Sequence, residues 1–358
     1  MYTGEKTSNQ YFVCQKHLSE PICFNLDNLE SVPTPECIYF GRAFQEMEKS
    51  LKASNLTVFL TDNLHSLPVY GHNVVVVLYA DEWCRFPSYA HKVLAVFKVY
   101  GTKLILGCNP LLRPSRLNLL TLVQFIKTHL IRSSSWIKYR LNYLKQYLNG
   151  CKLAVNIFEV PLGYYRQLDL PIKDIETRSF NVFFGGSITH REYKSLDPRY
   201  LVSTPKTVSR QLMLSYLDEL KITNQDLKIE YYVTPRFVPG YTENTGAEMK
   251  IYSEKMMDSK ICLAPRGTSF ETYRFFESMR YGCVVITEAL PPYWFYAGSP
   301  AIQIEDWSKL GGILESLIKD KDTLKEIHQQ SLEWWQSKCS ESALGTYMAE
   351  TLNTLLAS

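Results

Sequence analysis

The chain has 358 residues, of which 46% are hydrophobic and 21% charged, and its formal net charge is +3. This is the composition of a soluble globular protein, and it excludes a disordered or collagen-like chain. The length allows two domains, each with its own core. The nine cysteines show no metal-ligand spacing, and their odd number favours buried thiols in a reducing compartment.

Two features of the sequence bear on location. The N-terminus, Met1–Lys6, has no apolar signal core, and the longest purely apolar run, Val74–Ala80, is too short to span a bilayer. We therefore expect a cytoplasmic protein that also associates peripherally with membranes. The alternative is a chain from which a membrane anchor has been removed.

The first half of the chain alternates between short apolar runs and helical patterns. The runs predict strands at Tyr11–Cys14, Cys37–Phe40, Leu56–Leu60, Val74–Tyr79, Lys103–Leu106 and Ala154–Val160. Helical patterns cover Phe44–Leu51, Ser88–Tyr100 and Leu117–Leu148. This alternation predicts a doubly wound α/β domain over residues 1–165.

Charge is distributed unevenly along the chain. From Trp83 to Phe158 there are twelve Lys and Arg and no Asp or Glu, which leaves −9 for the remainder. Within this stretch, residues 113–147 interleave basic and aromatic side chains, a pattern that suits an anionic membrane surface or an anionic acceptor. Two alternatives are an ordinary solvated helix face and pairing with the acidic remainder. We expect no nucleic-acid partner, since no such binding motif accompanies the basic residues.

A second α/β domain is predicted from about residue 166 to 325. Its first strand, Phe180–Phe184, ends in a Gly185-Gly186-Ser187 turn, which can present backbone N–H groups to phosphate or be a plain tight turn. The helix Ser203–Leu220 carries Arg210, placed either to reach a diphosphate or as a surface charge. Other predicted elements are the strands Lys228–Val233 and Ala301–Ile304 and the helices Tyr252–Ser259, Leu310–Ile318 and Thr323–Leu355.

The most informative stretch is Lys260–Trp294. It reads as a strand (261–264), a loop that contains Pro265-Arg266-Gly267, a helix (270–281), a C-cap glycine at Gly282 and a second strand (283–286). Ligands of parallel sheets bind at the carboxyl ends of strands, against helix N-termini. The Arg266 fork suits a phosphate, and Gly267 permits close approach of the backbone.

Farther along the same helix, Arg274 and Glu277 share one face because they are three residues apart. Glu277 can pair with Arg274 or accept hydrogen bonds from a ribose. We favour the second role.

Pro265-Arg266-Gly267, Arg274, Glu277-Ser278, Gly282–Ile286 and Leu290-Pro291 together resemble the C-terminal signature of exostosin-like glycosyltransferases. Thr272 stands where the family often has Ser, and Ser278 where Ala is usual. The resemblance implies an inverting enzyme of polysaccharide biosynthesis with the GT-B fold, in which two Rossmann-like domains face each other across a cleft. Residues 1–165 would bind the acceptor and 166–325 the nucleotide sugar. The helix in 326–358 would cross back to the first domain, with Trp334-Trp335 as its apolar face.

Sugar transfer requires the departing diphosphate to be neutralised. The only DxD pair, Asp320-Lys321-Asp322, reads as a helix start, so we expect arginines rather than a metal at the diphosphate. No cofactor is expected beyond the nucleotide-sugar donor, for which a UDP-sugar is favoured. The expected donor-site residues are Gly185, Gly186, Arg210, Pro265, Arg266, Gly267, Thr272, Arg274 and Glu277.

A base must also accept the proton of the attacking hydroxyl. Asp81 and Glu82 follow the strand 74–79 and are the expected catalytic carboxylates, although Arg85 is close enough in sequence to pair with one of them. His65 and His91 are reserve candidates.

The expected acceptor is a glycan or a lipid-linked glycan. Fucosyltransferase-like or nucleotide-sugar epimerase chemistry on the same fold is one alternative, and a non-catalytic sugar- or membrane-binding partner is another.

Overall fold

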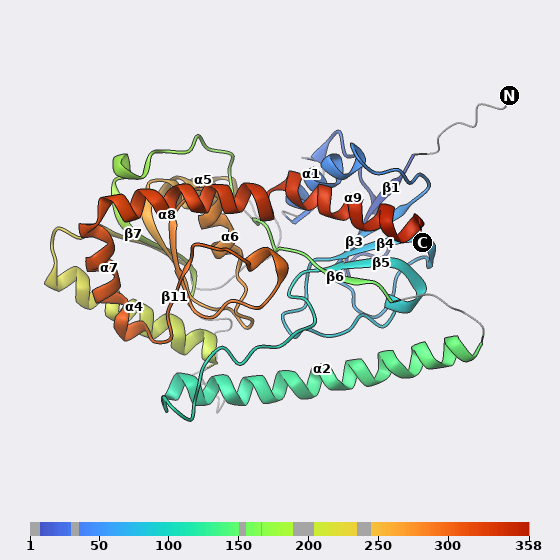
Figure 1. Ribbon diagram of the computed structural model, residues 1–358, viewed down its shortest axis with the longest axis horizontal. Coiled ribbons are helices and arrows are strands. Elements are labelled where there is room, and N and C mark those ends of the chain that lie inside the picture. Colours follow the sequence, from blue (N-terminus) through green and yellow to red (C-terminus); the bar gives the residue numbers. More distant parts are fainter. Residues whose placement is uncertain are drawn as a thin grey trace. The chain divides into compact units, whose positions relative to one another are not determined.

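In the computed structural model, which describes residues 8–29, 36–149, 155–165, 167–188, 204–234 and 245–357, the chain forms two compact units (Figure 1). Unit 1 comprises residues 1–104, 127–162 and 340–358, and unit 2 comprises residues 105–126 and 163–339. These units differ in two places from domains divided near residues 165 and 325. Residues 105–126 group with unit 2, and residues 340–358 group with unit 1.

Unit 1 contains a six-stranded sheet in the order β2-β1-β3-β4-β5-β6. Its strands are β1 (Gln10–Cys14), β2 (Ile22–Cys23), β3 (Thr57–Thr61), β4 (Gly71–Leu78), β5 (Val93–Lys98) and β6 (Ile157–Glu159). Every pairing is parallel except that of β1 with the edge strand β2. Apart from β2, the strands lie side by side in chain order, so the order never reverses. The central strands β4 and β5 are buried apolar runs because helices or loops cover both faces of a parallel sheet.

The helices of unit 1 come from distant parts of the chain. They are α1 (Glu36–Glu48), α9 (Glu341–Ala357) and the part of α2 (Arg116–Leu148) that begins at Lys127. Helices α1 and α9 pack closely, since a Cβ at Gly345 would lie 2.5 Å from the carbonyl oxygen of Ala43. The end of the chain therefore completes the packing of its beginning.

Three elements predicted in the first third of the chain are wrong. Residues 37–40, expected as a strand, lie in α1, where Cys37, Phe40, Phe44 and Met47 form a buried face with helical spacing. Residues 88–100, expected as a helix, contain β5, whose six buried residues show no period that separates strand from helix. Residues 103–106, expected as a strand, belong to no strand.

Unit 2 contains a five-stranded parallel sheet in the order β11-β10-β9-β7-β8. Its strands are β7 (Phe180–Ser187), β8 (Ile229–Thr234), β9 (Ser259–Ala264), β10 (Val284–Thr287) and β11 (Ile302–Gln303). The order reverses between β7 and β9: β8 follows β7 on one side, and β9, β10 and β11 follow on the other. In doubly wound sheets the crevice at such a reversal is where ligands bind.

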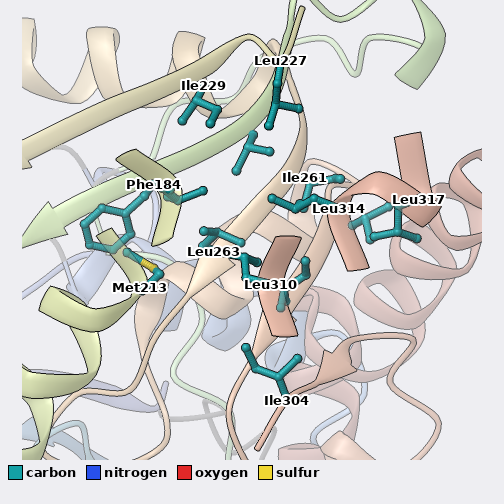
Figure 2. Close-up of a cluster of buried hydrophobic side chains, with 14 of the residues drawn as sticks. Phe184, Met213, Leu227, Ile229, Ile261, Leu263, Ile304, Leu310, Leu314 and Leu317 are labelled. Carbon is teal, nitrogen blue, oxygen red and sulfur yellow. The ribbon is translucent and has the colours of Figure 1, made fainter. Parts of the chain in front are cut away.

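Helices cover both faces of this sheet. They are α4 (Pro205–Thr223), α5 (Thr245–Met257), α6 (Tyr273–Arg280), α7 (Leu310–Lys319) and α8 (Lys321–Trp334). On one face Phe184 and Leu263 pack with Met213 of α4 and Leu310 of α7 (Figure 2). Neighbouring strand residues point the other way, toward Met256 of α5. The expected α/β class, with parallel sheets and flanking helices, is confirmed.

The two tryptophans of the C-terminal region pack within unit 2. Trp334 contacts Phe275 edge-on at 5.7 Å between ring centroids, and Trp335 lies 6.4 Å from Tyr164. Tyr164 belongs to the expected first domain (residues 1–165) and Phe275 to the expected second, so the two tryptophans contact residues of both. A π-helical turn over Trp335–Cys339 follows them, and α9 begins after it.

Candidate functional site

The predicted donor segments meet at the strand reversal of unit 2. Strand β7 ends with Gly185-Gly186-Ser187, and β9 runs directly into Pro265-Arg266-Gly267. Because both strands are parallel neighbours, their carboxyl ends lie at the same edge of the sheet. Helix α6 begins at Tyr273, three residues later than expected, and Thr272 is its N-cap residue. The sequence therefore placed these segments at the sheet edge where doubly wound folds bind ligands.

The far end of α6 is fixed by its cap, as the sequence predicted. Gly282 has φ of +67°, and its N–H donates to Met279 O while Cys283 N–H donates to Ser278 O, at 2.9 and 3.0 Å. This is a Schellman cap. His328 donates from Nδ1 to the Gly282 carbonyl at 2.6 Å and supports the turn from α8. The register of α6, and with it the direction of its polar residues, is thereby set.

Arg274 is the cation best placed to hold an anion. It is 8% exposed, it donates from Nε to the carbonyl of Gly185, and its guanidinium lies over the Phe184 ring, 4.7 Å from the centroid. Among the described residues its Nη1 has no hydrogen-bond partner. Burial lowers the pKa of Arg274, and the nearby Tyr252 and Glu277 oppose that shift. A buried cation with an open donor is costly unless an anion completes it.

The two glycines of β7 make room for this arrangement. Gly186 has φ of +143°, and a Cβ at this position would overlap Nη2 of Arg274. A Cβ at Gly185 would lie 2.5 Å from the Tyr252 ring. The Gly-Gly-Ser segment was expected as a turn that offers N–H groups to phosphate. It is instead the end of a strand paired with β8, and its glycines accommodate side chains.

Arg266 and Arg210 are buried and held by protein groups. Arg266 donates from Nη1 to the hydroxyl of Thr121 at 3.1 Å and from Nη2 to the carbonyl of Thr268 at 3.3 Å, and it stacks over Phe270. Arg210 donates to the carbonyls of Ser187 and Arg266. Arg210 is therefore no surface charge, and both arginines brace the loop that follows β9. Pro265 and Gly267 are buried in that loop.

Glu277 is buried opposite two tyrosines. Its Oε1 accepts the backbone N–H of Tyr165 at 3.0 Å, and its Oε2 accepts the hydroxyl of Tyr252 at 2.7 Å. Burial and the neighbouring carboxylate raise the pKa of Tyr252, so its hydroxyl stays a donor. Each carboxylate oxygen has a second lone pair that a ribose hydroxyl could use.

The sequence did not single out Glu288, which directly follows β10 at the same sheet edge. Its Oε1 accepts hydrogen bonds from the Ser209 hydroxyl, from Trp307 Nε1 at 3.3 Å and from the Arg266 backbone N–H at 3.3 Å. Its position after a buried parallel strand was the available signal. Thr121 was also missed, and nothing in its surroundings in the sequence marks it.

Another buried polar atom of the expected donor site lies at the start of α6. The hydroxyl Oγ1 of Thr272 is buried and makes no hydrogen bond to the described residues. It stands at the N-cap of α6, two residues before Arg274. Two unsatisfied donors at one helix start are a departure from the usual satisfaction of buried polar groups.

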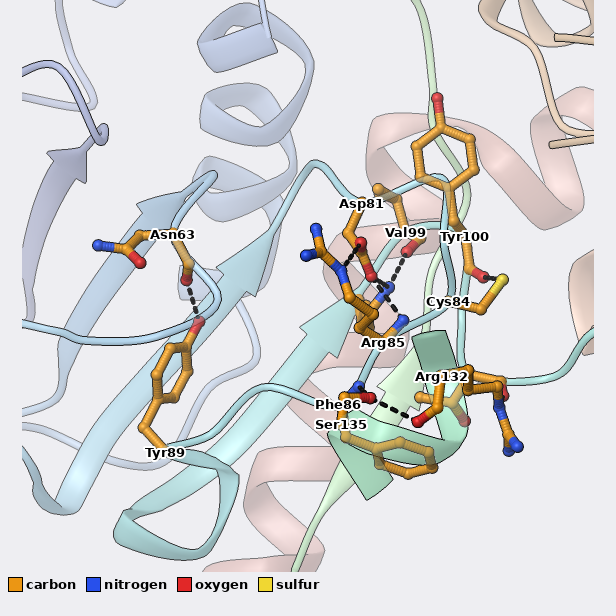
Figure 3. Close-up of polar contacts among 12 residues, drawn as sticks. Asn63, Asp81, Cys84, Arg85, Phe86, Tyr89, Val99, Tyr100, Arg132 and Ser135 are labelled. Carbon is orange, nitrogen blue, oxygen red and sulfur yellow. Dashed lines mark hydrogen bonds and ion pairs between the residues drawn. The ribbon is translucent and has the colours of Figure 1, made fainter. Parts of the chain in front are cut away.

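In unit 1, Asp81 lies in a buried ion cluster (Figure 3). It accepts from the Arg85 backbone N–H at 2.6 Å and from Arg85 Nε at 2.7 Å, and Lys98 Nζ lies 3.3 Å away. The side chains of Asp81 and Lys98 are 1% and 0% exposed, and Asp81 has φ of +93°. The pairing with Arg85 that was the alternative for this carboxylate is confirmed. Both carboxylate oxygens of Asp81 are thus engaged by groups of the fold, which favours a structural role for this residue.

Glu82, the second expected carboxylate, is half-buried, and the described residues offer it no hydrogen bond or ion pair. Of the reserve candidates, His65 is exposed. His91 is buried beside Tyr139, and burial lowers its pKa.

The DxD pair forms a helix start, as expected. Asp320 caps α8 by accepting from the Thr323 N–H at 2.9 Å and from its hydroxyl at 2.8 Å. Within the described ranges, no group of three His, Cys, Asp or Glu is arranged to hold a metal ion.

No model of a known protein family matches the chain. Among curated proteins, the chain is 25% identical over 196 residues to ribitol-5-phosphate xylosyltransferase 1 of Danio rerio. This match covers 51% of the chain and 42% of that protein, so the chain spans less than half the length of this relative.

Solved structures with similarity include sucrose-phosphate synthase of Thermosynechococcus elongatus, at 10% identity and a TM-score of 0.46, with 98% of this chain and 99% of that one covered. Another is a glycosyltransferase of avilamycin A biosynthesis, at 12% identity and a TM-score of 0.35, with 88% and 79% covered. Because these TM-scores are below 0.5, the description of the fold rests on the strand orders given above.

Proposed function

We propose that the chain is a glycosyltransferase that binds a nucleotide-diphosphate sugar at the strand reversal of unit 2 and transfers its sugar to an acceptor. The observation that carries this proposal is Arg274. It is a buried guanidinium with a donor that no described residue satisfies, at the carboxyl ends of β7 and β9 and at the start of a helix. Diphosphates are the ligands that such corners usually receive.

The other residues at the carboxyl ends of β7 and β9 and at the start of α6 take supporting roles in this proposal. Thr272 offers a second donor beside Arg274, and Glu277 accepts the ribose hydroxyls. Arg210, Arg266 and Glu288 hold the loop after β9 in position for the ligand, through the contacts described above.

The proposal extends to the type of glycosyltransferase, its donor, its acceptor and its catalytic base. The resemblance to the exostosin-like signature supports an inverting transferase of the GT-B type, with a UDP-sugar as donor and without a catalytic metal. The name of the Danio rerio relative supports a transferase of the same general kind and a phosphate-bearing acceptor. We therefore propose a glycan or lipid-linked acceptor that carries negative charge, as in the synthesis of a polysaccharide. Glu82 is proposed as the base that deprotonates the acceptor hydroxyl.

A fucosyltransferase-like or epimerase reaction remains the alternative use of the same donor site. Both reactions consume a nucleotide sugar, so product analysis separates them from the proposed transfer. An inactive sugar-binding chain would bind nucleotide and yield no product.

The direct test is a thermal-shift screen of the full chain against UDP, GDP, CMP and their sugars. A nucleotide at 100 times its Kd should stabilise the folded chain by about 2.7 kcal/mol. Arg274→Ala should weaken nucleotide binding about 10- to 100-fold, since a charge-assisted hydrogen bond is lost. Arg113→Ala, which removes an exposed arginine elsewhere in unit 2, is the matched control. Equal affinity of Arg274→Ala and the wild type would remove the basis of the proposal.

The metal-free part of the proposal has its own measurement. Donor turnover should persist in EDTA, because arginine rather than a divalent cation faces the diphosphate. Loss of turnover in EDTA and its recovery on adding Mn²⁺ would contradict this part and leave the donor site intact.

A further inference from the structure

Helix α2 carries a long apolar stripe that the rest of the described chain leaves uncovered. From Lys127 onward its exposed apolar residues include Leu130, Ile137, Leu141, Leu144 and Leu148, each 52–75% exposed. At 3.6 residues per turn these five side chains fall within an arc of about 60°. Exposed apolar surface of this extent usually marks a contact with a partner or a membrane.

The stripe is directly opposite the face by which α2 packs on unit 1. On the packed face Tyr139 stacks on Phe86, with 5.5 Å between ring centroids. Ser135 Oγ accepts the Phe86 N–H at 3.1 Å (Figure 3). Arg132 donates to the carbonyl of Thr102 at 2.5 Å. Tyr139 lies about 180° around the helix from Leu130. The orientation of the stripe therefore follows from contacts that hold the helix by its other side.

Basic and aromatic residues line both edges of the stripe. Lys138 and Lys145 are seven residues apart on one edge, and Arg140 lies on the other together with Trp136 and Tyr147. All of these side chains are exposed. The whole helix, Arg116–Leu148, contains no Asp or Glu. A narrow apolar stripe between cationic edges, with tryptophan and tyrosine beside it, is the pattern of a helix that lies in a lipid interface.

A second copy of the chain is a poorer fit to this face. Helices that pair through a heptad-like seam use opposite charges beside it, and two copies of α2 would bring only cations together. A soluble anionic acceptor would use the cations but would leave the apolar stripe in water. An anionic bilayer matches both features.

We propose that α2 is a membrane-docking helix that lies flat on an anionic lipid surface, with Leu130, Ile137, Leu141, Leu144 and Leu148 inserted among the acyl chains. Its lysines and arginines contact the lipid phosphates. The helix lies on the bilayer and does not cross it: none of the helices that the structure describes combines the length and apolar content needed for a span. The proposal does not depend on the sugar-transfer reaction.

The test is sedimentation of the full chain with vesicles of phosphatidylcholine alone or with 30% phosphatidylserine. We expect binding to the mixed vesicles that weakens with salt. Lys138→Glu, Arg140→Glu and Lys145→Glu together should lower the partition coefficient at least 100-fold. Lys250→Glu, Lys309→Glu and Lys319→Glu make the same change in net charge on exposed residues outside α2 and should have little effect. Equal binding of both triple variants would overturn the proposal.

The apolar part is tested separately. Ile137→Gln, Leu141→Gln and Leu144→Gln should lower binding at least 100-fold while keeping every charge, since glutamine is a good helix former. Leu212→Gln, Ile222→Gln and Leu356→Gln, at exposed positions of α4 and α9, are the matched control. Thermal unfolding of each variant verifies its fold.

Three outcomes would count against the proposal: no binding of the wild type to anionic vesicles, equal binding to neutral ones, or displacement by millimolar inorganic phosphate. The last would indicate a soluble anionic ligand. A dimer in solution that the glutamine variant abolishes would instead assign the stripe to a second copy. Nucleotide affinity is measured on the same variants and should not change, which separates this proposal from the donor site.

Discussion

The two units of this chain treat polar residues at the ends of their strands in opposite ways. In unit 1 the order of the strands does not reverse, and Asp81 forms ion pairs with Arg85 and Lys98 inside the fold. In unit 2 the order reverses between β7 and β9, and at the reversal Arg274 keeps a donor that no described residue satisfies. Unit 1 pairs its strand-end carboxylate with its own cations, whereas unit 2 leaves one guanidinium nitrogen of Arg274 without a partner among the described residues.

This difference teaches that a charged residue after a strand is not by itself a functional residue. Asp81 follows β4, Arg274 donates from α6 to the Gly185 carbonyl near the carboxyl end of β7, and both are buried. Their hydrogen bonds separate them, because both oxygens of Asp81 have partners in the fold whereas Nη1 of Arg274 has none among the described residues.

The largest effect is expected at Glu82. Glu82→Gln removes the proposed base and should lower kcat about 10²- to 10⁴-fold with the unfolding temperature unchanged. Turnover of acceptor under saturating donor measures this. Glu20→Gln, an exposed carboxylate of unit 1, is the control. A kcat within threefold of the wild type would show that the base lies elsewhere.

Asp81→Asn should act on stability. It leaves Lys98 buried without its counter-charge, so the free energy of unfolding should fall by about 3–5 kcal/mol, measured by urea denaturation. The double variant Asp81→Asn with Lys98→Met should recover part of that loss, since the orphaned cation is gone. A stable Asp81→Asn protein that has lost its activity would instead return Asp81 to the list of catalytic groups.

Gly186→Ala should displace the guanidinium of Arg274 in unit 2 without removing any charge. The added methyl overlaps Nη2 of Arg274, so the guanidinium must move and nucleotide affinity should fall about tenfold. Gly298→Ala is matched to it, because Gly298 also has positive φ, +75°, yet a Cβ there has open space. Calorimetric titration of nucleotide compares the two variants. Similar affinities would mean that Arg274 does not touch the ligand.

The smallest effect is a pH dependence present in both units. Burial lowers the pKa of His91 in unit 1 and of His328 in unit 2 below the ordinary 6.5. As pH falls below about 6.5, these histidines bind protons in the unfolded chain before they do so in the folded chain. The free energy of unfolding therefore falls as pH falls below that value. His328→Gln keeps a donor for the Gly282 carbonyl and should make the fall in unfolding temperature between pH 7.5 and 5.5 about 1–3 °C smaller. An unchanged fall would exclude His328 as a contributor.

Much of unit 2 was predictable because its signals are local. The Lys260–Trp294 stretch combines two β-branched or apolar strand runs, a helix and a glycine with positive φ, and the structure matches each of these to within a few residues. The sequence also identified the two segments that meet at the strand reversal, Gly185-Gly186-Ser187 and Pro265-Arg266-Gly267. What was not predictable is the partner of each side chain. That Gly186 makes room for Arg274, and that Thr121 holds Arg266, depends on residues 88 and 145 positions apart in the chain.

Unit 1 was harder to predict for a physical reason. Its central strands are buried on both faces, so β5 lacks the alternation that identifies a strand and was read as part of a helix. The long helix α2 was predicted almost to its ends, because 33 residues of helical pattern leave little ambiguity. The apolar stripe on α2 followed only from the structure, which shows which of its faces is already in use.

The exchange of segments between the units has a consequence for biosynthesis. Helix α1 packs against α9, which leaves the ribosome after every residue of unit 2. Unit 2 is complete once residue 339 has emerged, whereas residues 1–104 and 127–162 of unit 1 must wait, partly assembled, for residues 340–358. The usual N-to-C order of domain maturation is thus reversed, and a chaperone that guards the nascent protein would be expected to hold its oldest part longest.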